Sequence, residues 1–139
     1  KKIDDLSLNK YIIIHDSVPH DEVAKFYSII DLFCLYRHNI PLCRITPPLK
    51  LFEAMATEKA VIVSDLPVLR EFVKHNETAY CIKSDNSKVL ADSIKYLMDN
   101  PLLAARLGKN ARDCIIKNYQ WEYNIRKYLQ VYDFVKEKE

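Results

Sequence analysis

Glycine is almost absent from this chain: Gly108 is its single glycine among 139 residues. Phosphate-binding loops of the G-x-G-x-x-G or Walker type need several glycines, because the backbone must approach the phosphate closely. The chain therefore contains neither loop. Either it does not bind phosphate in that way, or the segment that carries such a turn lies upstream, and the lack of an initiator methionine favours the second interpretation.

Long apolar runs and a strong charge of one sign are missing as well. The longest purely apolar run, at residues 32–36, has five residues, whereas a membrane-spanning helix needs roughly 20. Lysine and arginine number 21 against 19 acidic residues, a net charge of +2, so bulk charge does not indicate nucleic-acid binding. With no apolar signal region at the N-terminus, we expect a cytoplasmic protein, or an excised part of one.

Cysteine and histidine show none of the usual metal-site spacings. The four cysteines are far apart in the sequence and form no C-x-x-C pair, which excludes the common zinc and thioredoxin patterns. The four histidines are scattered over different predicted elements. We expect buried, reduced thiols and no metal site.

Apolar segments alternate with helical periodicity along most of the chain. Strands are predicted at residues 11–15, 31–36, 60–64 and 79–82, and helices at residues 20–30, 48–56, 67–73, 88–98, 101–117 and from 121 onward. Strands that alternate with helices predict a parallel sheet covered by helices. The fold class is therefore α/β, Rossmann-like, with an all-helical C-terminal segment, and residues 1–139 form a single domain.

Two of the predicted helices, at residues 48–56 and from 121 onward, carry clear apolar faces. The helix at residues 48–56 is expected to bury Leu49, Phe52 and Met55 on one side. The last helix carries a stripe that includes Trp121 and Tyr132, which we interpret as mostly core.

A polar, proline-containing loop at residues 37–47 precedes the helix that starts near Pro48. In open parallel sheets ligands bind beyond the carboxyl ends of the strands, where helix N-termini present unpaired N–H groups. A diphosphate would suit this helix start, and a carboxylate one turn further on could accept hydrogen bonds from a ribose diol. The candidate ligand-site residues of this loop and helix start are Arg37, Arg44, Thr46, Leu49, Lys50 and Glu53. The alternative is that Lys50 and Glu53 form a surface pair and Arg44 is merely solvated.

The amino-acid sequence of this region resembles that of a known protein family. Residues 46–56 read T-P-P-L-K-L-F-E-A-M-A, followed by K-A-V-I-V-S-D at 59–65 and E-F-V at 71–73. Together with the ordered flanking segments, this string resembles the C-terminal, donor-binding half of family-4 glycosyltransferases of the GT-B fold. The resemblance covers essentially the whole chain, which then looks like an N-terminally truncated fragment.

The resemblance implies a nucleotide-diphosphate sugar as donor. Glu53 matches the family's ribose-binding glutamate, and the amides of Leu49 and Lys50 would face the diphosphate. No metal cofactor is implied. The acceptor, a glycan or a lipid-linked molecule, would meet an N-terminal domain that is missing here, so the fragment alone should not transfer sugar. A longer parent could associate peripherally with a membrane; no nucleic-acid partner is implied.

One departure keeps other interpretations open. The family often has two glutamates separated by seven residues, and Ile45 occupies the first of these positions. A non-catalytic Rossmann-like binding or regulatory module is therefore a second hypothesis. A receiver-like signalling domain ranks last, because Asp16, Asp31 and Asp65 lie at different kinds of positions.

Overall fold

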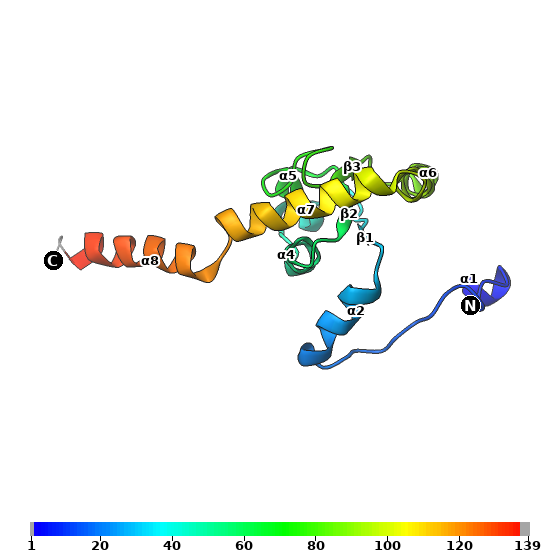
Figure 1. Cartoon of the computed structure of the whole chain (residues 1–139), viewed down its shortest axis with the longest axis horizontal. Coiled ribbons are helices and arrows are strands. Elements are labelled where there is room, and N and C mark those ends of the chain that lie inside the picture. The colour runs from blue at the N-terminus through cyan, green and yellow to red at the C-terminus, as the bar shows by residue number, and fades with distance from the viewer. Residues whose placement is uncertain (1, 137–139) are drawn as a thin grey trace.

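A three-stranded parallel sheet forms the centre of the computed structural model, which describes residues 2–136. The strands are β1 (Leu32–Leu35), β2 (Ala60–Ser64) and β3 (Tyr80–Ile82), in the order β1-β2-β3. Leu32 pairs with Ala60, and Ile62 pairs with Tyr80. All three strands thus end at one edge of the sheet, where the loops that follow them come together (Figure 1).

Strand β2 is the centre of the core because every one of its residues is buried. Its side chains alternate between the two faces of the sheet, as strand geometry requires. Val61 and Val63 belong to one apolar cluster, and Ile62 belongs to a second one with Leu97 and Leu107. Both faces of β2 are therefore covered, which explains why its sequence is continuously apolar.

Helices cover both faces of the sheet and extend beyond it. Their bounds are α1 (Lys2–Asp5), η1 (His20–Glu22), α2 (Val23–Ile29), α3 (Pro41–Ile45), α4 (Leu49–Ala56), α5 (Pro67–Arg70), α6 (Ser87–Asp99), α7 (Pro101–Asn118) and α8 (Trp121–Lys136). Helix α7 packs against both α4 and β2. Helix α8 continues away from the sheet (Figure 1).

The contact between α7 and the end of α4 is unusually close. A Cβ at Gly108 would overlap the carbonyl oxygen of Glu58, so glycine lets α7 approach the turn between α4 and β2. Arg112, one turn further along α7, donates a hydrogen bond to the carbonyl of Ala56 at the end of α4. These contacts fix the position of α4 beside the sheet.

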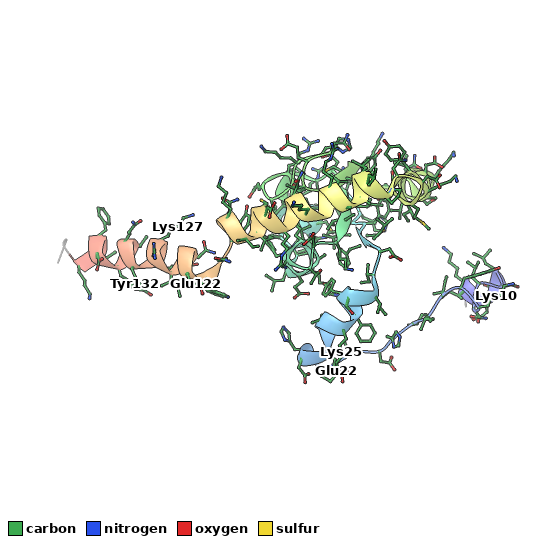
Figure 2. All side chains as sticks on the ribbon, in the orientation of Figure 1. Lys10, Glu22, Lys25, Glu122, Lys127 and Tyr132 are labelled. Atoms are coloured by element: carbon green, nitrogen blue, oxygen red, sulfur yellow. The ribbon has the colours of Figure 1, made fainter. Side chains whose placement is uncertain are left out.

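The predicted strands at residues 31–36, 60–64 and 79–82 are confirmed, and so is the α/β class. The strand predicted at residues 11–15 is wrong: this segment has no regular structure, and Ile13 and Ile14 are 82% and 76% exposed. Figure 2 shows this segment away from the sheet, between α1 and α2, and the His15 ring at its end contacts Phe26 of α2. A β-branched run favours extended backbone, but it forms a strand only beside a hydrogen-bonding neighbour, and none of the described strands lies beside this segment.

Two predicted apolar faces also need correction. Helix α4 buries Leu51, Ala54 and Met55, while Leu49 is 77% exposed, because the buried face repeats at i, i+3 and i+4 from Leu51 and Leu49 lies on the other side of the helix. The stripe on α8 is exposed rather than core, with Trp121 at 74% and Tyr132 at 65%, since α8 leaves the sheet (Figure 2). No helix in the described part of the chain is long and apolar enough to cross a bilayer.

The cysteines are free thiols, as expected, but none is fully buried. Cys34 on β1 is exposed, and the other three are partly covered. The expectation of buried thiols is therefore wrong: Cys34 lies on β1, which is only partly covered, and the other three cysteines pack at the margin of the larger core cluster.

Candidate functional site

The candidate site lies where the loop after β1 meets the start of α4, at the carboxyl edge of the sheet. Ser64, the last residue of β2 and fully buried, braces the beginning of this loop. Its hydroxyl accepts a hydrogen bond from the backbone N–H of Arg37 at 2.7 Å and donates one to the carbonyl of Arg37 at 2.8 Å. A single side chain thus satisfies both backbone groups of Arg37.

Side chains within the loop hold its two ends together. The Arg37 guanidinium donates to the carbonyl of Thr46 at 2.6 Å, which joins the start of the loop to the residues just before α4. Arg44 Nε donates to the side-chain oxygen of Asn39 at 2.7 Å. Of the six predicted residues, Arg37 and Thr46 are therefore in direct contact.

The loop after β3 forms hydrogen bonds with the loop after β1. Asp85 accepts hydrogen bonds from His38 Nδ1 at 2.6 Å and from the N–H of Asn39 at 3.2 Å. The bond from His38 holds the pKa of the Asp85 carboxyl below its usual value. Next to it, the N–H of Asn86 donates to the hydroxyl of Tyr36 at 2.5 Å. Two loops that are distant in sequence are thereby joined across the end of β2.

Helix α4 begins without a side-chain cap. Its N-cap is Pro48, and no side-chain hydrogen bond satisfies the N–H groups of the first turn. Leu49 and Lys50 are exposed residues, and within the described part of the chain their N–H groups, which lie at the positive end of the helix dipole, donate no hydrogen bond. Because residues three and four apart share a helix face, Glu53 lies one turn below this pair.

Glu53 is half-buried and is held by a residue from another helix. The Tyr27 hydroxyl, on α2, donates a hydrogen bond to Glu53 Oε2 at 2.9 Å. Burial, together with the adjacent Glu53 carboxylate, raises the pKa of Tyr27 well above its ordinary value. The phenol consequently keeps its proton and remains a donor.

Tyr27 and Ser64 are site-positioning residues that the sequence pattern did not reveal. The helical spacing of Tyr27 and its apolar neighbours predicts a core residue, and its ring does belong to the larger core cluster. The spacing does not indicate that its hydroxyl reaches the site. Ser64 ends an apolar strand and carries no motif signal. Ile45 is 75% exposed on α3, with no carboxylate at that position.

The Lys50–Glu53 surface pair considered above is not formed in the described part of the chain, since Glu53 bonds to Tyr27 instead. Nor do three histidine, cysteine, aspartate or glutamate side chains of residues 2–136 gather as metal ligands would. Arginine, lysine, amide and carboxylate groups are thus the chemistry that this site offers.

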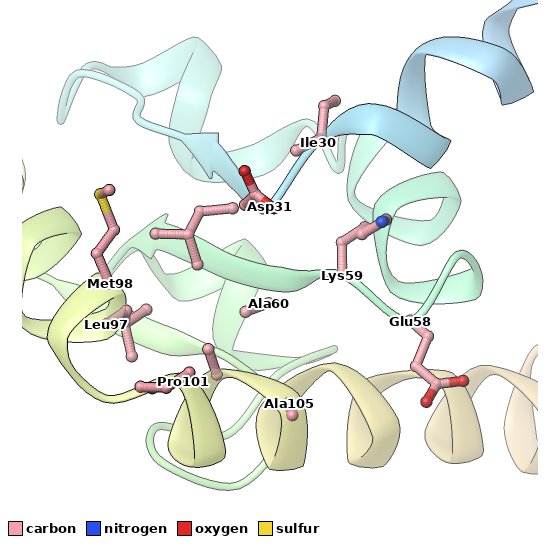
Figure 3. A pocket seen from close by; sticks show the side chains of 11 residues that line it. Ile30, Asp31, Glu58, Lys59, Ala60, Leu97, Met98, Pro101 and Ala105 are labelled. Carbon is pink, nitrogen blue, oxygen red and sulfur yellow. The ribbon is translucent and has the colours of Figure 1, made fainter.

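A groove of about 410 Å³ opens at the opposite end of the sheet (Figure 3). Ala60 at the start of β2, Pro101 and Ala105 of α7 and Met98 of α6 line it, with Asp31 and Lys59 at its rim. Because it lies at the amino ends of the strands, it is separate from the start of α4.

The protein family to which the chain belongs follows from its sequence. The sequence pattern of the family described as "Glycosyl transferases group 1" matches residues 1–114, most of the chain. The chain belongs to this family. The resemblance of its "PLK..EAMA" region to glycosyltransferases of the GT-B fold is thereby confirmed.

This group 1 glycosyl transferase chain is 32% identical over 126 residues to the N,N'-diacetylbacillosaminyl-diphospho-undecaprenol alpha-1,3-N-acetylgalactosaminyltransferase of Campylobacter jejuni. The match covers 88% of the chain and 31% of that relative. Across the four curated relatives it matches, the chain spans between 17% and 33% of their length. It corresponds to one part of these larger proteins.

Solved structures identify which part. The C-terminal domain of a group 1 glycosyl transferase from Francisella tularensis superposes with a TM-score of 0.73 at 24% identity, over 86% of this chain and 60% of that one. Anabaena HepE, solved in complex with UDP-glucose, superposes with a TM-score of 0.78 at 16% identity, over 98% of this chain and 35% of that one. The fold of this group 1 chain is that of a GT-B C-terminal domain.

Proposed function

We propose that this chain is the donor-binding part of a glycosyltransferase that moves a sugar from a nucleotide-diphosphate sugar to a glycan or lipid-linked acceptor. The proposal rests on the geometry at the start of α4. The N–H groups of Leu49 and Lys50 stand one turn from a half-buried Glu53 at the carboxyl edge of a parallel sheet. Ligands of open α/β sheets bind at this edge.

The chemistry of sugar transfer matches these groups. As the bond between the anomeric carbon and the diphosphate breaks, negative charge gathers on the departing diphosphate oxygen. Preorganised N–H groups and the positive end of a helix stabilise such charge. The side chains of Arg44 and Lys50 add two cations beside the same helix start, and Glu53 is left to accept hydrogen bonds from the ribose hydroxyls.

The relatives support the same chemistry. The Campylobacter jejuni protein is named for transfer of N-acetylgalactosamine to a lipid-linked sugar, and Anabaena HepE was solved with UDP-glucose. We take a UDP-sugar as the first donor to test and a lipid-linked glycan as the first acceptor.

Calorimetric titration of the chain with UDP, GDP, ADP and their hexose conjugates tests the proposal. We expect selective binding of one nucleotide. Glu53→Ala should weaken that binding about tenfold or more, because hydrogen bonds to a charged group contribute roughly 1.5–3 kcal/mol. Glu77→Ala is the matched control, since Glu77 lies in the turn before β3, at the other end of the sheet, and pairs only loosely with Lys74 at 3.6 Å.

Two results would overturn the proposal. One is the absence of binding to every nucleotide and nucleotide sugar. The other is binding that Glu53→Ala and Glu77→Ala weaken equally, which would locate the ligand away from the start of α4.

A further inference from the structure

The hydrogen bond between Tyr27 and Glu53 joins the hydrophobic core to the proposed ligand site. The ring of Tyr27 is 6% exposed and belongs to the larger core cluster. It packs against Phe33 of β1 with ring centroids 5.7 Å apart. The hydroxyl at the end of this fixed ring reaches Glu53 Oε2 at 2.9 Å.

A fixed donor matters because a glutamate side chain has several rotatable bonds. Holding such a side chain still costs roughly 0.5–1.5 kcal/mol when a ligand must do it on binding. A phenol anchored in the core does this in advance. The carboxylate therefore has its geometry before any ligand arrives.

The hydrogen bond from Tyr27 also makes the two carboxylate oxygens of Glu53 different from each other. An ionised carboxylate accepts about four hydrogen bonds, two at each oxygen. Within residues 2–136, Tyr27 occupies one of these positions on Oε2, and no protein donor bonds to Oε1. Oε1 remains available to a ligand that carries hydroxyl donors.

The protonation state of Tyr27 also leaves Glu53 as the acceptor in this pair. Tyr27 stays protonated far above neutral pH, so its hydroxyl donates and Glu53 accepts. A carboxylate held in this way can only accept from a ligand, as recognition of a diol requires.

We propose that Tyr27 is a positioning residue for the donor ribose: its hydroxyl holds Glu53 so that the second carboxylate oxygen accepts hydrogen bonds from the ribose diol. This inference rests on the proposed function. Tyr27 itself does not touch the nucleotide; it acts through Glu53.

Tyr27→Phe tests the inference, because phenylalanine keeps the packed ring and removes only the hydroxyl. Tyr96→Phe is the matched control, since within the described residues the Tyr96 hydroxyl has no hydrogen-bond partner and its ring stacks on Tyr80. Each variant is titrated with the nucleoside diphosphate that the wild-type chain binds and with the 2′,3′-dideoxy form of that nucleotide. Thermal unfolding of both variants checks that the fold is retained.

We expect Tyr27→Phe to weaken binding of the ribonucleotide about two- to tenfold, the range of one ordinary hydrogen bond. Binding of the dideoxy form should stay unchanged, because it has no diol for Glu53 to accept from. Tyr96→Phe should change neither affinity. In the ligand-free chain, the carboxyl ¹³C resonance of Glu53 should move in Tyr27→Phe and stay in Tyr96→Phe.

The outcomes separate the two proposals. Equal weakening of both nucleotides by Tyr27→Phe, or no weakening of either, overturns the positioning role while the donor site stands. A Glu53 carboxyl resonance that does not respond to Tyr27→Phe overturns it as well, with no ligand involved. A wild-type chain that binds no nucleotide overturns the proposed function, and the ribose role of Tyr27 with it.

Discussion

Replacing Gly108 with alanine should destabilise this protein, although alanine is the better helix former. Gly108 lies in the middle of α7, where helix propensity alone favours alanine by about 1 kcal/mol. The new methyl group, however, would overlap the carbonyl oxygen of Glu58 and lie 2.9 Å from its carbonyl carbon. Propensity and packing therefore predict opposite signs.

The neighbouring backbone has little room to move away. Glu58 has a φ of 61°, a left-handed conformation that is already unfavourable for a residue with a side chain. Lys59 follows it directly into β2, whose residues are all buried. Forcing extra volume into such a contact typically costs 1–3 kcal/mol. After subtracting the gain of about 1 kcal/mol in helix propensity, we expect a net loss of up to about 2 kcal/mol and a fall in Tm of up to about 8 °C for a chain of this size.

Thermal and urea unfolding followed by circular dichroism measure this change. Lys109→Ala, at an exposed position of the same helix, serves as the control and should alter the free energy of unfolding by less than about 0.5 kcal/mol. If Gly108→Ala instead stabilises the protein by about 1 kcal/mol, helix propensity decides and α7 does not contact the Glu58 turn as closely as described.

Two further predictions concern the loops at the carboxyl edge. Ser64→Ala should lower the free energy of unfolding by about 1–3 kcal/mol in urea titrations, because two hydrogen bonds to partly buried backbone groups of Arg37 are lost. Ser87→Ala, at an exposed position, should have little effect. Equal effects of the two variants would show that the hydrogen bonds of Ser64 contribute nothing to stability. The pair of His38 with Asp85 should stabilise the fold above about pH 4, the unfolded pKa of an aspartate, and lose this effect as pH falls through the lower folded pKa of Asp85. The stability difference between wild type and Asp85→Asn should accordingly shrink on acidification, and a difference that is constant with pH would contradict the pairing.

The sequence predicts those parts of the fold in which local pattern and tertiary context agree. Residues 60–64 form a strand because their continuous apolar run suits a position covered on both faces. Residues 11–15 carry a comparable run and form none, because pairing depends on a neighbour that local pattern cannot supply. Leu49 shows the same limit: its spacing matches one apolar face of the helix, but the helix buries a different face, that of Leu51 and Met55.

The candidate site, too, could be predicted only in part from the sequence. The helix start at Pro48 and the position of Glu53 on α4 follow from composition and spacing. The contacts that hold the site do not, because Tyr27 lies 26 residues from Glu53 and Ser64 lies 27 residues from Arg37. Nothing in a local pattern records which distant side chains meet at a sheet edge.

Chemical-shift mapping of the ¹⁵N-labelled chain during titration with UDP-glucose, and with the GDP and ADP sugars in parallel, shows whether a nucleotide sugar binds at the start of α4. It reports the location of binding as well as its existence. The account predicts that one nucleotide sugar perturbs the amides of Thr46, Leu49, Lys50 and Glu53 most strongly. Perturbations centred on the amides of Ala60, Met98 and Ala105 in the groove at the amino ends of the strands, or no perturbation by any of the three nucleotide sugars, would contradict it.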